Sequence, residues 1–97
     1  MTNETWTPEP PAPTRLYRCS DYPRRVRAES PGAAAVIVAR YLARKRFGRS
    51  VRLWSVESDG RVGASEWHYR STVIGPQARC YGNTVLGTLR ISVRTEA

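Results

Sequence analysis

A single helix with clear boundaries constrains the fold of this chain more than any other feature. Residues 28–50 read AESPGAAAVIVARYLARKRFGRS. Within this stretch Ser30 is a good N-cap, Pro31 suits the first helical position, and Gly48 suits the residue after the last turn. The sequence therefore predicts a helix over residues 31–47.

The predicted helix has two different faces. At about 100° per residue, one arc collects apolar side chains that should pack on a sheet, namely Ala34, Ile37, Val38, Tyr41 and Leu42. Arg40 and Arg44 lie one turn apart on the opposite side, flanked by Val36 and Ala43. The helix thus combines a core-forming face with a basic face.

Strand-like segments surround the helix. Five segments have the composition or the alternation typical of strands, and they are residues 15–19, 24–28, 50–58, 61–74 and 84–94. Asp59-Gly60 is a strong hairpin signal, and Gly63 suits a bulge in the strand that follows. The order ββαβββ predicts an α+β fold, a two-layer sandwich with one α-helix packed on a mostly antiparallel sheet whose second face is uncovered.

Alternation along these strands assigns side chains to the two faces of the sheet. Three same-face groups are expected, namely Arg52, Trp54 and Val56; Val85, Leu89, Ile91 and Val93; and Glu66, His68 and Arg70. The uncovered face is therefore the first place to look for a site.

The first fourteen residues have a different composition from the rest of the chain. They contain four prolines and no basic residue, which favours an extended tail without a core. We expect residues 1–14 to be a disordered tail and residues 15–97 to be a single small domain. A domain of that size buries roughly 60 to 65% of its unfolded surface, enough for one core.

The chain is strongly basic. It has 16 basic and 8 acidic residues, for a net charge of +8, and two of the acids lie in the tail. Such a charge favours polyanionic partners. Fifteen of the basic residues are arginine, a skew that a GC-rich genome also produces.

The basic residues of the helix and of the next strand form the candidate binding site. We expect contacts to nucleic acid from Arg40, Arg44, Arg46, Arg49 and Arg52, with Trp54 or Trp67 as a stacking platform. Competing explanations are that cations in the last turn stabilise the helix dipole and that the tryptophans anchor the core. RNA or single-stranded DNA is favoured over duplex DNA, because the sequence contains no helix-turn-helix motif.

Other function classes remain open. The chain could be an interaction module or small inhibitor that docks on an acidic protein, or a homodimer that covers the bare sheet face. Glu66, His68 and Arg70 could instead serve as base, acid and phosphate-stabilising group of a metal-independent ribonuclease. Three alternating polar residues are common on exposed strands, so we expect a protein that is not an enzyme.

Several further classes find no support in the sequence. Cys19, Cys80 and His68 lack the paired spacing of zinc ligands, and no Walker or GxGxxG motif is present, so no metal or cofactor is expected. No apolar run is long enough to span a membrane, and no export signal is visible. We therefore expect a cytoplasmic protein without a membrane partner, whose two cysteines are reduced.

Overall fold

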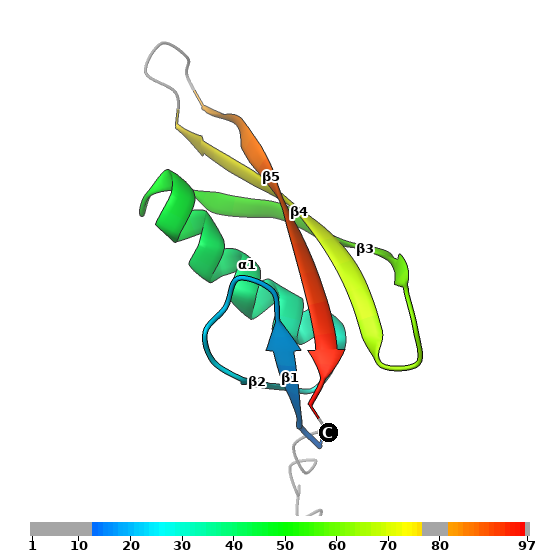
Figure 1. Cartoon of the computed structure of the whole chain (residues 1–97). Coiled ribbons are helices and arrows are strands. Elements are labelled where there is room, and N and C mark those ends of the chain that lie inside the picture. Colours follow the sequence, from blue (N-terminus) through cyan, green and yellow to red (C-terminus); the bar gives the residue numbers. More distant parts are fainter. Residues whose placement is uncertain (1–12, 77–81, 97) are drawn as a thin grey trace, which may run out of the picture.

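One helix covers one face of a five-stranded sheet in the part of the chain that the structure describes, residues 13–76 and 82–96 (Figure 1). The elements of this computed structural model are β1 (Arg15–Cys19), β2 (Val26–Ala28), α1 (Pro31–Phe47), β3 (Arg52–Arg61), β4 (Glu66–Pro76) and β5 (Asn83–Thr95). The strands are paired in the order β2-β1-β5-β4-β3, and every pairing is antiparallel. The predicted two-layer α+β sandwich with the order ββαβββ is confirmed.

Helix α1 begins and ends where its capping residues predict. Ser30 Oγ accepts a hydrogen bond from the Ala33 N–H at 3.1 Å. At the other end, the Gly48 N–H donates to the Arg44 carbonyl at 3.0 Å, and the φ of Gly48 is 96°. A residue with a Cβ is disfavoured at that angle, so glycine ends the helix here.

The face that α1 turns toward the sheet is built from smaller side chains than predicted. Its buried residues are Ala34, Ala35, Val38, Ala39, Leu42 and Ala43. The prediction that Ile37 and Tyr41 belong to this face was wrong, since they are 41% and 39% exposed. The four alanines have small side chains, so the helix backbone lies close to the sheet. At this short distance between helix and sheet, bulky side chains such as Ile37 and Tyr41 fit only at the edge of the interface.

The turn between β3 and β4 lies later in the chain than predicted. Strand β3 continues through Asp59 and Gly60, and the hairpin closes where the Val62 N–H donates to the Glu66 carbonyl at 2.9 Å. Gly60 has a φ of 114° and lies at a shift in the β3–β4 register, so it forms a bulge. Positive φ suits a bulge as well as a turn, which is why the Asp-Gly signal was misleading. Gly63, predicted at a bulge, lies in the turn region instead.

Two further irregularities change which side chains share a face. The β3–β4 register shifts between Leu53 and Ser55, and both Leu53 and Val56 pack against the core. Grouping Val56 with the outward-facing residues of β3 was therefore wrong. A shift between β4 and β5 likewise leaves Val85 62% exposed, although alternation placed it on the buried face. One inserted residue reverses the orientation of every side chain beyond it, and alternation alone does not locate the insertion.

The face of the sheet opposite α1, here called the open face, is covered by none of the described elements (Figure 1). Trp67 and Tyr69 of β4 pack against the core on the helix side. The alternate residues Glu66, His68 and Arg70 therefore share the open face, as predicted. A homodimer through this face would have to bury these charged side chains, and it stays a prediction.

Some predictions lie wholly or partly outside the described ranges. The proposed tail lies almost entirely outside them, and Cys80, the second of the two cysteines expected to be reduced, lies outside them as well. Cys19 is buried at the end of β1, and burial raises the pKa of its thiol to about 11. Within residues 13–76 and 82–96, no helix combines the length and the apolar character that crossing a bilayer requires.

Candidate nucleic-acid interface

A groove runs between helix α1 and the edge strand β3. Its volume is about 540 Å³, and it opens to solvent. The helix supplies Val36, Arg40, Ala43 and Arg44, and the strand supplies residues 51–56. Since β3 ends the sheet, no neighbouring strand covers this side of it among the described residues. We call this feature the α1–β3 groove.

The helix side of the groove follows from helical periodicity. Arg40 and Arg44 are separated by one turn, so their exposed guanidinium groups lie along the same rim. The smaller Val36 and Ala43 line the groove beside them. The basic face predicted from the sequence is thus one wall of a concave surface.

Trp54 forms the aromatic part of the opposite wall. It lies at the shift in the β3–β4 register between Leu53 and Ser55, where it has no partner on β4. A bulge re-aims the side chain of the extra residue, and Trp54 is 72% exposed as a result. A large aromatic side chain held open on a rigid strand is a surface on which a planar group can stack.

The charge of the groove is of one sign. Among the residues that the structure describes, three arginines and no Asp or Glu line it; the lining consists of Arg40, Arg44, Arg52, Trp54 and small or aliphatic residues. None of the ion pairs among the described residues involves these three arginines. Their guanidinium groups are therefore available to an external anion.

The structure brings together four of the seven predicted site residues. Arg40, Arg44, Arg52 and Trp54 share the α1–β3 groove. Arg46 and Arg49 are exposed at and after the last turn of α1 but do not line the groove.

Trp67 lies elsewhere, among core residues. It packs edge-on against Tyr17 with ring centroids 6.5 Å apart, and the Arg61 guanidinium lies over its ring at 5.6 Å. The placement favours the core-anchor explanation for this tryptophan. The two tryptophans thus separate into one in the core and one at the surface.

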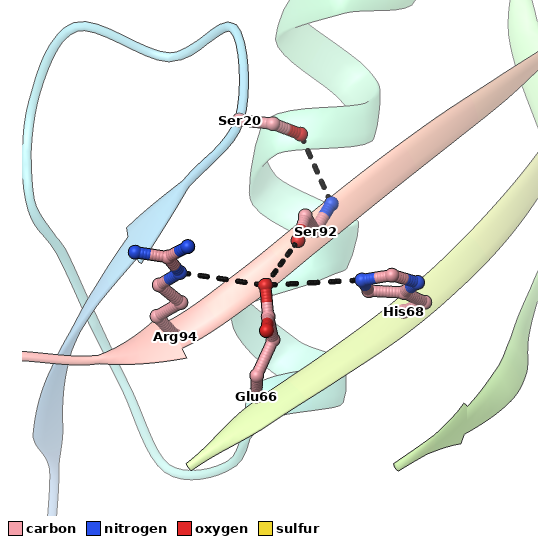
Figure 2. A network of polar contacts seen from close by, with 5 residues as sticks. All are labelled: Ser20, Glu66, His68, Ser92 and Arg94. Atoms are coloured by element: carbon pink, nitrogen blue, oxygen red, sulfur yellow. Dashed lines mark hydrogen bonds and ion pairs between the residues drawn. The ribbon is translucent and has the colours of Figure 1, made fainter. Parts of the chain in front are cut away.

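A second polar cluster lies on the open face and is centred on Glu66 (Figure 2). Glu66 Oε1 accepts hydrogen bonds from Ser92 Oγ at 3.1 Å and from Arg94 Nε at 3.4 Å, and lies 3.8 Å from His68 Nε2. The bond from Ser92, followed by the one from Arg94, lowers the pKa of the Glu66 carboxyl. Ser20 Oγ in turn accepts from the Ser92 N–H at 3.0 Å.

This cluster differs from the sequence-based expectation. Instead of acting as a catalytic set, Glu66 and Arg70 each form a cross-strand ion pair, Glu66 with Arg94 at 3.4 Å and Arg70 with Glu57 at 3.5 Å. Ser92 and Arg94 lie on one face of β5, and the strand register, in which Glu66 is opposite Arg94, brings the carboxylate to both of them. A ribonuclease of the kind considered above needs its base and its acid on opposite sides of the phosphorus. Glu66 and His68 contact each other instead, so no phosphate fits between them in this arrangement.

The sequence matches no family model, and comparisons with curated proteins and with solved structures likewise give no match.

Proposed function

We propose that this protein is a small, non-catalytic nucleic-acid-binding protein that holds a single strand of RNA or DNA in the α1–β3 groove. The observation that carries the proposal is a groove in which, among the described residues, three arginines have no ion-pair partner, one tryptophan is exposed and no acidic residue is present. Arginine supplies the phosphate contacts, and Trp54 supplies the stacking surface.

A single strand suits this groove better than a duplex. A base can stack on Trp54 only when it is free of its neighbour in a helix, and unpaired bases meet this condition. Stacking on one aromatic residue contributes about 1–3 kcal/mol per base regardless of sequence. We therefore expect weak sequence preference and strong dependence on salt.

An acidic peptide that adds a strand to β3 is the other occupant to consider. Strand addition needs a regular edge, and the bulge at Trp54 interrupts the edge within the groove. The bulge also exposes an aromatic ring, which an added strand does not need. These features favour the nucleic acid.

Fluorescence anisotropy with labelled oligonucleotides tests the proposal. The probes are a single-stranded RNA, a single-stranded DNA, their duplexes and an acidic peptide of matched charge, measured from 50 to 300 mM salt. We expect tighter binding of the single strands, and a slope of log K against log salt near −2, from about −0.7 for each of three phosphates.

The matched control is a triple variant of the same charge. Replacing Arg40, Arg44 and Arg52 by Gln should remove most of the salt dependence, whereas replacing the exposed Arg15, Arg24 and Arg27 by Gln should leave most of it. Equal losses in both triple variants, or preference for the acidic peptide, would contradict the proposal.

A cytoplasmic location is part of the proposal. Single-stranded RNA is abundant there, and the buried thiol of Cys19, with its pKa raised to about 11, suits a reducing compartment. Fractionation of the native cell with and without nuclease checks both the location and the partner.

A further inference from the structure

We infer that the open face carries a second anion site, separate from the α1–β3 groove, which takes a phosphate group on Arg90. Arg90 is an exposed residue of β5, and it shares the open face with Ser92 and Arg94. The inference goes beyond the proposed function, because none of the residues that line this site lines the groove.

Like charges lie opposite each other across the strands of the open face. Arg90 of β5 lies directly opposite Arg70 of β4, and Arg94 of β5 lies directly opposite Arg18 of β1. Like charges in opposite positions destabilise a sheet unless something neutralises them. Two such pairs on one face indicate that counter-charge is supplied there.

The protein itself supplies this counter-charge to every one of these arginines except Arg90. Arg94 pairs with Glu66 at 3.4 Å and Arg70 with Glu57 at 3.5 Å. Arg18 pairs with Glu96 at 3.2 Å. Arg90 makes no ion pair and no side-chain hydrogen bond with any described residue. The guanidinium group of Arg90 is therefore available to an external anion.

A hollow in the surface lies beside Arg90. Its volume is about 270 Å³, several times the roughly 30 Å³ that one water molecule occupies. The residues that line it are Ser20, Asp59, His68, Tyr69, Arg90, Ile91 and Ser92. Arg90 thus faces a space large enough for a phosphate group and its remaining waters.

The hollow also offers hydrogen-bond donors. Ser20 Oγ accepts from the Ser92 N–H, which leaves the hydroxyl proton of Ser20 free to donate. The guanidinium of Arg90 presents a planar fork that matches two phosphate oxygens. Asp59 is the one acid in the lining; it is exposed and lies beside the Gly60 bulge, so its carboxylate can turn toward solvent.

The network around Glu66 keeps this arrangement in place (Figure 2). Glu66 accepts hydrogen bonds from Ser92 and Arg94 and lies beside His68. Its carboxylate therefore fixes the positions of these three neighbours of Arg90. Glu66 itself does not line the hollow. The Glu66 carboxylate is thus occupied by other donors.

Titration with inorganic phosphate, followed by amide chemical shifts, tests the site directly. We expect shifts at residues 90–92, 68 and 20 that persist when Arg40, Arg44 and Arg52 are replaced by Gln. Arg90→Gln should weaken phosphate binding by about tenfold or more, because the ion pair with the phosphate is lost. Arg24→Gln, which removes the same charge away from both sites, should change it less than twofold.

Oligonucleotides distinguish the two sources of phosphate. If Arg90→Gln also weakens binding of a 20-nucleotide strand but not of a 5-nucleotide strand, the phosphate belongs to a longer nucleic acid that reaches both sites. If it weakens binding of inorganic phosphate only, the site serves a small phosphorylated molecule. Either result supports the site.

The inference is overturned if phosphate shifts no residue of the hollow, or if Arg90→Gln and Arg24→Gln behave alike. Circular dichroism shows that each variant is folded, and Arg90→Lys, which keeps the charge but loses the fork, should retain only part of the affinity. The triple variant of the α1–β3 groove should keep the phosphate-induced shifts at residues 90–92, so failure of this site is distinguishable from failure of the proposed function.

Discussion

The α1–β3 groove and the open face are both rich in arginine, but they use it differently. On the open face Arg18, Arg70 and Arg94 each have an acidic partner across the sheet. In the groove none of the three arginines has an ion-pair partner among the described residues, and a tryptophan stands beside them. Charge counts alone do not separate a stabilised surface from a binding surface, but the partners of each charge do.

Charge reversal at matched positions is the strongest test of this comparison. Arg40→Glu with Arg44→Glu should lower the affinity for single-stranded RNA by about 100-fold at low salt, because two phosphate contacts become repulsions. Arg18→Glu with Arg94→Glu makes the same change in net charge on the open face. It should lower the affinity for single-stranded RNA by less than about threefold. Filter binding at 50 mM salt measures both. Equal losses would mean that net charge, and not the groove, governs binding.

The two tryptophans should separate binding from stability. Trp54→Ala should weaken binding of single strands by about 5- to 150-fold, the loss of one stacked base, while leaving the thermal midpoint nearly unchanged. Trp67→Ala should do the reverse and cost about 2 kcal/mol of folding free energy, because this side chain packs against the core. Fluorescence anisotropy measures the binding of single strands by the two variants, and urea unfolding measures their folding free energies. A Trp54→Ala protein with unaltered affinity would remove the stacking role.

Gly60 lies opposite His68 at the second bulge of β3. Gly60→Ala should destabilise the protein by about 1–2 kcal/mol, because its φ of 114° is unfavourable for a residue with a Cβ although no atom lies within 4 Å of the added group. Gly63→Ala, at a position of similar openness without positive φ, should change stability by less than about 0.5 kcal/mol. Urea denaturation compares them, and equal effects would contradict the bulge assignment.

The smallest expected effect is the contribution of Glu66 to stability in acid. Its pKa is lowered in the folded state, chiefly by Ser92 and then by Arg94, so its stabilising effect is complete above the ordinary value of 4.5 and is lost as the pH falls through the folded value. Glu66→Gln should show a flatter decline of the thermal midpoint between pH 5 and 3. Glu57→Gln, which removes an exposed acid paired with Arg70, is the control. The test checks that the open face holds its own counter-charge.

The capping residues predicted the helix correctly. Predictions that depended on regular alternation along the strands were wrong where the strand register shifts. Ser30, Pro31 and Gly48 act within one or two turns, so their signal does not depend on the rest of the fold. The positions of Val56 and Val85 depend on where a register shift occurs, and the shift is decided by pairing with a distant strand. Trp54 was assigned to a candidate site from its sequence context, but the bulge that exposes it was not visible there.

The sequence by itself determined the basic character of the chain, the capped helix and the order ββαβββ, because composition, capping and periodicity are properties of neighbouring residues. Only the tertiary structure decided which arginines have partners. Arg40 and Arg52 line the same groove because α1 packs beside the edge strand, and Glu66 meets Arg94 because β4 and β5 pair in one particular register. Both encounters join residues far apart in the chain, and such pairings depend on packing across the whole core.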